Sequence, residues 1–464
     1  MTQSGTDPTS ADQLRTLIAR YDRPGPRYTS YPTAPVWTDE FGEEAFREAL
    51  RRSTGAQRSI YVHIPFCERL CSFCACNRKI SQDHSVAAPY LDAIEREAEM
   101  IASELASGPQ TVQFAVGGGS PNFLSESELA RMADIVDRCF PPAADAERSI
   151  ELDPRNTTQG QLEALAAHGF NRMSLGVQDT SPRVQRAINR IQSRAQIEAL
   201  VQGARDMGMS GVNFDLIYGL PYQTVESFDD TLNQVIEMRP DRIALYSYAH
   251  VTWISKAQRG FEKKDLPKPD QKVAIFLHAV ERLEDAGYLY LGLDHFALPD
   301  DELARAAAAG ALRRNFMGYT VRPGVDLLAL GASGISELAD SYAQSIRDPD
   351  GYEEASSGGH LPTLRGCHLN DDDVRRRWLI HGVMCQSEIN GSAYQQQFEE
   401  SLETRVPDLH ERLVEFVEDG LLEQRNGTYQ VTRLGRLFLR VIAMTFDAYL
   451  EPPDPDKPKF SKTV

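Results

Sequence analysis

Four of the seven cysteines of this chain lie in the short stretch CERLCSFCAC, which runs from Cys67 to Cys76. Cys67, Cys71 and Cys74 have the spacing Cys-x-x-x-Cys-x-x-Cys, which places three thiolates on one tight loop. A zinc site usually adds a second cysteine pair at a distance, and no such pair is present. Three close thiolates favour a cubane iron–sulfur cluster with one open iron, and a small zinc loop is the alternative. We predict that Cys67, Cys71 and Cys74 bind metal and that Cys76 does not.

An iron that no side chain ligates can bind a cofactor or a substrate, so a cluster of this kind is expected to be catalytic. The elements that would position it can be predicted from the apolar pattern. Six short β-rich runs predict strands at 59–66, 111–119, 149–154, 171–179, 211–221 and 242–250. Helical spacing lies between them, as from Tyr90 to Leu105, where apolar residues share one face. Strands that alternate with helices predict parallel strands joined by crossovers.

The expected fold class is therefore α/β, in the form of a partial (β/α)6 barrel. Parallel folds gather their functional residues at the carboxyl ends of the strands. Unusual residues follow five of the predicted strands in turn, as HIPFC, GGGSP, DPR, QD and YGLP. This agreement supports the fold and places the cysteine loop at the mouth of the barrel.

The chain is expected to have three parts: an N-terminal arm (1–55), the barrel (56–370) and a C-terminal domain (371–464). The arm contains GPRYTSYPT (25–33), which has too many prolines and turns for a regular element. The C-terminal part predicts helices at 374–384 and 408–418, a hairpin at Asn426-Gly427 and a helix from Leu434. This order is mostly helical and winged-helix-like. The proline-rich tail from residue 451 is expected to be extended or disordered.

Composition describes an ordinary globular protein, with 41% hydrophobic and 25% charged residues. A net charge of -18 argues against nucleic acid as a partner, because phosphate binding needs clustered Lys and Arg. The sequence shows neither a secretory signal nor an apolar run long enough to span a bilayer. We expect a cytoplasmic monomer that binds neither nucleic acid nor membrane.

The motifs resemble those of a known family. The block YVHIPFCERLCSFC looks like the cluster loop of radical S-adenosylmethionine enzymes. In detail the chain is similar to the oxygen-independent coproporphyrinogen III oxidase family, and the similarity extends almost from end to end. The matching blocks, in order, include GPRYTSYPT, GGGSP, ELDPR, NRMSLGVQD, DLIYGLP, LDHFALPDDEL, RNFMGYT and LGASGIS.

The resemblance implies a 4Fe-4S cluster and two molecules of S-adenosylmethionine as cofactors. It also implies a 5′-deoxyadenosyl radical that removes hydrogen from two propionate side chains of coproporphyrinogen III. Loss of carbon dioxide and a further electron from each would leave vinyl groups, giving protoporphyrinogen IX in haem and porphyrin biosynthesis. The resemblance therefore implies two partners. One is the porphyrinogen substrate, and the other is an electron donor that the sequence does not identify.

Residue roles follow from the resemblance block by block. The first cofactor molecule would contact Tyr61, Gly118, Glu151 and Ile335. The second would contact Phe73, Gly119, Ser120, Gln178, Arg190, Asp215 and Ala249. Because the substrate carries four carboxylates, several arginines should face it, and Arg27 and Arg314 are the candidates.

Two positions depart from the family pattern. Met317 stands where the family would have Gln, and Leu298 stands where it would have Arg, so substrate choice could differ. A related radical methyltransferase or cyclopropanase acting on another substrate is one alternative. A haem chaperone is a second, but it would lack Cys76 and the GPRYTSYPT stretch, which are present. A gene-regulatory winged-helix protein is the third, and the acidic excess of the C-terminal part disfavours it.

Overall fold

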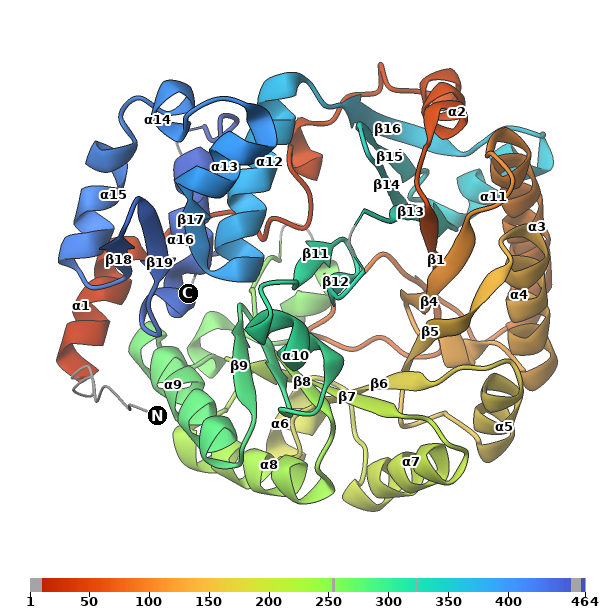
Figure 1. The fold of residues 1–464 in the computed structure, drawn as a ribbon. Helices are drawn as coiled ribbons and strands as arrows, with labels where there is room; N and C mark the ends of the chain where they lie inside the picture. Colours follow the sequence, from red (N-terminus) through yellow and green to blue (C-terminus); the bar gives the residue numbers. More distant parts are fainter. Residues whose placement is uncertain (1–10, 253–254, 323, 452–459, 464) are drawn as a thin grey trace.

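The computed structural model describes residues 11–252, 255–322, 324–451 and 460–463. Its largest element is a 12-stranded sheet in the order β16-β15-β14-β13-β1-β4-β5-β6-β7-β8-β10-β9 (Figure 1). Six neighbouring strands of this sheet are parallel and follow one another in chain order. They are β1 (Gln57–Ile64), β4 (Gln110–Gly118), β5 (Pro142–Leu152), β6 (Arg172–Gln178), β7 (Gly211–Tyr218) and β8 (Arg242–Ser247). The predicted partial (β/α)6 barrel is confirmed, and each of the six predicted strands overlaps one of these.

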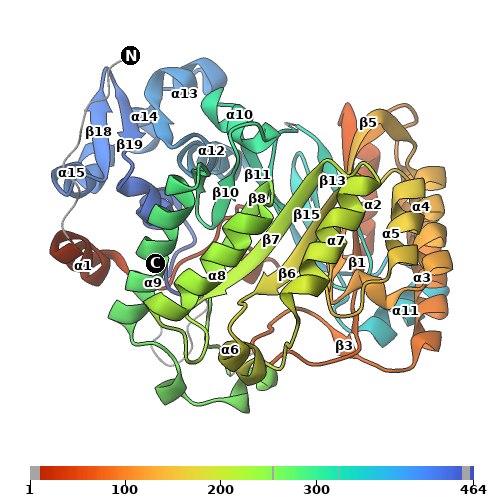
Figure 2. The same cartoon turned by 90° about the horizontal axis from the view of Figure 1, so that it is seen from below.

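Helices cover the outer face of the parallel strands (Figures 1 and 2). They are α3 (Ala87–Glu104), α4 (Glu126–Cys139), α5 (Gln159–Ala167), α7 (Arg194–Asp206) and α8 (Val225–Met238). The short helix α6 (Pro182–Ala187) packs instead in a separate small cluster with Ile217 and Tyr248. Several of these helices begin with a capping box. In α4, for example, the Ser125 side chain accepts from the Glu128 backbone N–H, and the Glu128 side chain accepts from the Ser125 backbone N–H. The helix expected at 90–105 is α3, which begins three residues earlier.

The barrel is partial because other strands occupy both of its edges. β13 (Asp326–Leu330) pairs in parallel with β1, and antiparallel strands extend each side. These are β14 (Ile335–Leu338), β15 (Ser341–Ser345) and β16 (Thr363–His368) on one edge, and β10 (His295–Ala297) and β9 (Leu289–Gly292) on the other. The sequence did not predict them. They are short. In addition, Leu293, at the turn between β9 and β10, has a positive φ of 54°, which is uncommon for leucine, so the sequence does not indicate a turn there.

Further helices follow the barrel, namely α9 (Pro269–Asp285), α10 (Glu302–Ala308) and α11 (Pro349–Ser357). None of the helices in the described ranges combines the length and the apolar character needed to cross a bilayer. The proline-rich tail predicted as extended or disordered falls largely outside the described residues, at 452–459.

The C-terminal part combines helices with a small sheet in the order β17-β19-β18. Its elements are α12 (Asp371–His381), β17 (Glu388–Asn390), α13 (Gly391–Phe398), α14 (Leu402–Arg405), α15 (Leu409–Glu418), β18 (Leu422–Arg425), β19 (Thr428–Val431) and α16 (Leu439–Ala443). The predicted hairpin is present, and Asn426 and Gly427 both have positive φ, as a two-residue turn requires. The helix expected to 384 ends at His381 and passes into a π-helical turn, Gly382–Gln386.

The N-terminal arm joins the barrel to the C-terminal part. Helix α1 (Ala11–Tyr21) packs in the C-terminal core, whereas α2 (Glu43–Arg52) packs in the barrel core. Between them, residues 25–33 form no helix or strand, as expected. The buried Arg440 of α16 donates to the carbonyl groups of Gly25 and Pro26. The arm thus contributes residues to both hydrophobic cores. The division of the chain into three parts at residues 55 and 370 remains a prediction.

A buried carboxyl group ties α3 to the loop after β13. Glu97 is 2% exposed, and its Oε2 atom accepts from the Gly331 N–H at 2.8 Å and the Tyr352 hydroxyl at 2.6 Å. Burial raises the pKa of Glu97 to about 8. An unfolded glutamate titrates near about 4.3, so the folded chain holds an extra proton between these two values. Its contribution to stability is complete below this window and is lost as the pH rises through it.

Glu97→Gln should therefore flatten the pH dependence of stability. The amide keeps an oxygen that can accept from Gly331 and Tyr352 but does not titrate. The free energy of unfolding, measured with urea, should fall as the pH rises from about 6 to about 9. We expect this fall to be larger in the unaltered chain than in Glu97→Gln, by of the order of 2 kcal/mol. Glu99→Gln, an exposed change on the same helix, is the control. Equal pH dependence in all three proteins would contradict the assignment to Glu97.

Candidate active site

A cavity of about 380 Å³ lies inside the barrel. Alternate residues of the parallel strands point into it, as the two-residue period of a strand requires. On four strands, residues two positions apart line the cavity: Tyr61 and His63; Glu147, Ser149 and Glu151; Gly211, Asn213 and Asp215; and Arg242, Ala244 and Tyr246. Ile150 and Val212, which lie between members of these sets, also reach its wall. Because most of these side chains are polar, the interior is suited to a ligand rather than to an apolar core.

Four residues predicted for the cofactor line this cavity: Tyr61, Glu151, Asp215 and Ile335. Burial and the neighbouring Asp215 raise the pKa of Glu151 to about 7, although Glu151 accepts a hydrogen bond from the Gly118 N–H at 3.3 Å. Burial also raises the pKa of Asp215 to about 6. Two adjacent carboxyl groups in a cavity are suited to binding a cation or hydroxyl groups.

The cysteine loop begins in β2 (Phe66–Cys67), which pairs with β3 (Lys79–Ile80). Backbone hydrogen bonds hold it, from the Lys79 N–H to the Pro65 carbonyl at 2.6 Å and from the Ser72 N–H to the Ile188 carbonyl at 2.9 Å. The Asn189 side chain also donates to the Leu70 carbonyl at 2.7 Å. The loop is therefore fixed while its thiols remain free of disulfides.

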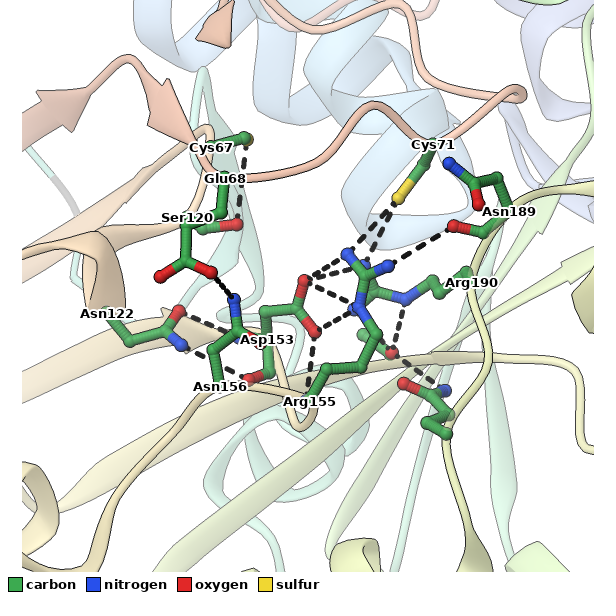
Figure 3. Close-up of polar contacts among 12 residues, drawn as sticks. Cys67, Glu68, Cys71, Ser120, Asn122, Asp153, Arg155, Asn156, Asn189 and Arg190 are labelled. Atoms are coloured by element: carbon green, nitrogen blue, oxygen red, sulfur yellow. Dashed lines mark hydrogen bonds and ion pairs between the residues drawn. The ribbon is translucent and has the colours of Figure 1, made fainter. Parts of the chain in front are cut away.

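The three predicted ligands have different surroundings. Burial raises the pKa of Cys67 to about 11, and its sulfur lies 3.6 Å from the Ser120 hydroxyl. A hydrogen bond from Cys76 lowers the pKa of Cys74 to about 6, and the Cys76 N–H lies 3.4 Å from the Cys74 sulfur. Two guanidinium groups face the sulfur of Cys71 (Figure 3). Each sulfur is thus approached by a hydrogen-bond donor, which suits a metal-bound thiolate.

A cluster fits these residues better than a single ion does. Within the described ranges, no group of three or more His, Cys, Asp or Glu side chains is placed to hold one metal ion. In a cubane, each cysteine binds a different iron, so its thiolates stand farther apart than they do around one ion. The donor set Cys67, Cys71 and Cys74 therefore suits a cluster, and the small zinc loop is the poorer alternative.

The glycine loop after β4 lies against the start of the cysteine loop. The Gly119 N–H donates to the Ile64 carbonyl and the Ser120 N–H to the Phe66 carbonyl, both at 2.8 Å. A Cβ atom on Gly119 would stand 2.6 Å from the Phe66 oxygen, and Gly118 has φ 119°, which favours glycine. Larger residues here would push the two loops apart.

The remaining predicted contacts lie around the ends of the later strands. Gln178, at the end of β6, has φ 58°, and its buried Oε1 atom has no hydrogen-bond partner among the described residues. Arg190 donates to the Gly176 carbonyl at 2.8 Å. Phe73 packs beside a small apolar cluster that includes Tyr248, and Ala249 follows β8. A strained residue with an unpaired buried acceptor is a common feature of ligand sites.

Arg27 and Arg314 come from distant segments and lie close to each other. Burial and the charge of Arg314 lower the pKa of Arg27, which forms an ion pair with Asp294. Each arginine lies over a ring that lines the cavity, Arg27 over Tyr246 and Arg314 over Tyr319. The buried Nε and Nη1 atoms of Arg314 have no hydrogen-bond partner in the described part of the chain. Such unpaired charged donors are suited to an anionic ligand.

The two departures from the family pattern differ in position. Met317 lines the cavity, at the turn between β11 (Arg313–Asn315) and β12 (Gly318–Thr320). Leu298 packs against the barrel core and is not among the residues that line the cavity. Only Met317 is thus placed to contact a ligand there, and Leu298 does not lie where substrate choice would be decided.

Several residues of the site were not predicted from the sequence. Phe316, Tyr246 and His295 line the cavity, and Arg155 contacts Cys71. Tyr246 lies in a predicted strand, where the two-residue period was the signal that it could point inward. Phe316 and His295 lie in the blocks RNFMGYT and LDHFALPDDEL, where no periodic pattern indicates their direction. No sequence pattern links Arg155 to a cysteine 84 positions away.

Comparisons with known proteins agree with this geometry. Residues 61–235 match the Radical SAM superfamily, and residues 369–438 match the HemN C-terminal domain. The oxygen-independent coproporphyrinogen III oxidase of Escherichia coli is 42% identical over 434 residues, 94% of this chain and 95% of that protein. The protein of the same name from Pseudomonas aeruginosa is 40% identical over 452 residues, 97% and 98% of the two chains. A solved structure of the Escherichia coli coproporphyrinogen III oxidase, described as a radical SAM enzyme, has a TM-score of 0.89 and 41% identity, covering 94% of this chain and 99% of that one.

A partial parallel barrel with a three-cysteine loop at its mouth defines a radical SAM enzyme, and the superfamily match agrees. Its cofactors are those of the superfamily, a 4Fe-4S cluster and S-adenosylmethionine. Within that class, this chain belongs to the oxygen-independent coproporphyrinogen III oxidase family. The number of S-adenosylmethionine molecules remains a prediction.

Cys76→Ser should keep the cluster, because Cys76 is exposed and supplies a hydrogen bond to Cys74 through its backbone. Cys74→Ser should lose the cluster, since it removes a predicted ligand. Iron and sulfide content and the visible spectrum after anaerobic reconstitution would distinguish the two. Loss of iron from Cys76→Ser to the level of Cys74→Ser would show that the fourth cysteine is also a ligand.

Proposed function

We propose that this chain converts two propionate side chains of coproporphyrinogen III to vinyl groups without oxygen, giving protoporphyrinogen IX. The similarity to enzymes of that name, which extends over 94% of the chain and both matched domains, carries the proposal. Each propionate loses a hydrogen atom, carbon dioxide and one electron. The chain therefore needs two kinds of electron partner, a one-electron donor for the cleavage of S-adenosylmethionine and a one-electron acceptor for the electron that each decarboxylation releases.

In this proposal, Cys67, Cys71 and Cys74 hold the cluster and leave one iron for S-adenosylmethionine. When bound there, the cofactor supplies a 5′-deoxyadenosyl radical that removes a hydrogen atom from the propionate. The inward-facing residues of the barrel surround the reacting groups and exclude water and other hydrogen donors. The chain's own contribution is therefore to position and enclose them.

The carboxyl groups of the cavity are proposed to bind the cofactor. Glu151 and Asp215 can accept hydrogen bonds from an ammonium group and from ribose hydroxyls. Tyr61, Gly118, Glu151 and Ile335 form the proposed first site. Phe73, Gly119, Ser120, Gln178, Arg190, Asp215 and Ala249 form the proposed second site. The unpaired Oε1 of Gln178 supports a ligand at the second.

Arg27 and Arg314 are proposed to bind the carboxylates of the substrate. Arg314 is buried beside the cavity and Arg27 is one-third exposed, and two donor atoms of Arg314 have no hydrogen-bond partner among the described residues. A planar guanidinium group binds a carboxylate with two parallel hydrogen bonds. His295 lies near both, and its burial together with their charges keeps its pKa well below the usual value, so it remains neutral. Among the described residues, Asp294 forms an ion pair with Arg27.

An anaerobic assay tests the proposal. The reconstituted protein is mixed with coproporphyrinogen III, S-adenosylmethionine and a one-electron reductant, and the products are analysed by mass spectrometry. We expect a product that has lost two carboxyl groups. Intact porphyrinogen alongside cleaved S-adenosylmethionine would contradict the proposed substrate and favour a related radical enzyme, since Met317 lines the cavity.

Arg314→Gln should raise the KM for coproporphyrinogen III by about 10- to 100-fold, because a charge-assisted hydrogen bond contributes roughly 1.5–3 kcal/mol. Reductive cleavage of S-adenosylmethionine without substrate should persist, since Arg314 is not among the proposed cofactor contacts. Arg313→Gln is the matched control, because Arg313 already donates to the Leu312 carbonyl. An unchanged KM in Arg314→Gln would remove this residue from the substrate site.

A further inference from the structure

Two cationic side chains converge on one cysteine of the loop. Arg155 Nη2 lies 3.4 Å and Arg190 Nη1 lies 3.6 Å from the sulfur of Cys71 (Figure 3). By contrast, the hydrogen-bond partner of the Cys67 sulfur is the Ser120 hydroxyl and that of the Cys74 sulfur is a peptide N–H, although the charge of Arg78 also acts on both. Of the three proposed ligands, Cys71 is therefore the one with guanidinium donors in the described part of the chain.

One carboxylate holds both guanidinium groups. Asp153 Oδ2 accepts from Arg155 Nη2 at 2.6 Å and from Arg190 Nη1 at 3.1 Å, and Arg155 Nε bonds to both carboxylate oxygens. The Asp153 N–H donates to the Asn122 side chain at 3.1 Å, and the Asn122 amide donates back to the Asp153 carbonyl. The three charged side chains are only 5–9% exposed. Their geometry is fixed and little water screens them.

The charges do not cancel. Two guanidinium groups, which stay protonated, and one carboxylate leave one net positive charge at the Cys71 sulfur. Hydrogen bonds to cluster sulfurs and nearby charge are among the factors that set a cluster's reduction potential. An added electron makes the cluster more negative, so a fixed cation beside it favours reduction, and burial strengthens the interaction.

We propose that Arg155, positioned together with Arg190 by Asp153, raises the reduction potential of the cluster through the sulfur of Cys71. The step concerned is the transfer of one electron from an external low-potential donor to the cluster, which becomes more negative by one charge. The inference rests on the proposed cluster ligands but not on the identity of the substrate. Arg155 is thus a positioning and tuning residue.

The alternative role for Arg155 is structural, because Arg155 Nη1 also donates to the Asn189 carbonyl at 3.2 Å. A purely structural role would change stability and leave the potential unaltered. Arg190 is the poorer residue to test, since it also bonds to the Gly176 carbonyl and belongs to a proposed cofactor site.

The experiment compares the reconstituted full-length protein with Arg155→Gln, without S-adenosylmethionine or substrate. Iron and sulfide content first establishes equal cluster loading. The midpoint potential is then measured by anaerobic titration with redox mediators, followed by electron paramagnetic resonance of the reduced cluster. We expect the equilibrium constant for reduction of the cluster to be lower in Arg155→Gln by a factor of about 10 or more. For one electron, a factor of 10 corresponds to a midpoint potential about 59 mV more negative.

Arg148→Gln is the matched control. Arg148 lies on β5, the strand that precedes Arg155, and its side chain is as buried as that of Arg155. It forms an ion pair at 2.5 Å with Asp137, which is 34% exposed, and donates to the His168 carbonyl rather than to a cysteine. The midpoint potential of the cluster in Arg148→Gln should equal that in the unaltered protein. Equal potentials in Arg155→Gln and Arg148→Gln would overturn the proposal.

Asp153→Asn gives a second, independent answer with the opposite sign. Removing the carboxylate charge leaves both arginines uncompensated, so the midpoint should move to more positive values. A potential equal to or below that of the unaltered protein would overturn the proposal, even if Arg155→Gln fails to hold a cluster. If the decarboxylation assay fails, the differences in midpoint potential between the variants are still expected. If the unaltered protein holds no cluster, both the proposed decarboxylation and the proposed role of Arg155 are overturned.

Discussion

The close contact between the cysteine loop and the glycine loop after β4 is the constraint on which the site depends. The cysteine loop has to be rigid, yet its three thiols must remain free for iron. Backbone hydrogen bonds solve this, because Gly119 and Ser120 donate to carbonyl groups at the start of the loop. The contact requires glycine at position 119, since a Cβ atom on Gly119 would overlap the Phe66 carbonyl oxygen. Parallel strands bring the two loops together, because all their carboxyl ends lie on one side of the sheet.

The interior of the barrel follows from the same arrangement. Consecutive parallel strands curve around a cavity, and every second residue faces inward. Carboxyl groups such as Glu151 and Asp215 occupy these positions, and burial raises the pKa values of both. Glu151 is exposed to the cavity and Asp215 is partly buried, so a ligand in the cavity can reach both. Their presence is explained if a polar, cationic molecule occupies the cavity during the reaction.

The cationic side chains of the site form three sets. Arg172 and Arg242 line the cavity, where Arg172 forms an ion pair with Glu147. Arg27 and Arg314 lie over rings that line the cavity, and Arg155 and Arg190 face Cys71. The N-terminal arm supplies Arg27, and Arg440 of the C-terminal part fixes the neighbouring backbone. The arm and the C-terminal part therefore contribute to the site by completing its edge. A cationic cofactor and an anionic substrate can be bound side by side without competing for the same residues.

Local patterns in the sequence were enough to predict the three-cysteine loop, the six parallel strands and the Asn426-Gly427 hairpin. Each depends on residues only a few positions apart, through thiolate spacing, the strand period or backbone conformation. Other features depend on packing between distant segments, and only the tertiary structure decided them. Arg27 meets Arg314, Arg155 meets Cys71, and Leu298 lies outside the cavity because of how whole elements pack. The chemistry of the loop was thus determined by the sequence alone, whereas the charges around it were decided by the fold, since long-range contacts leave no periodic trace along the chain.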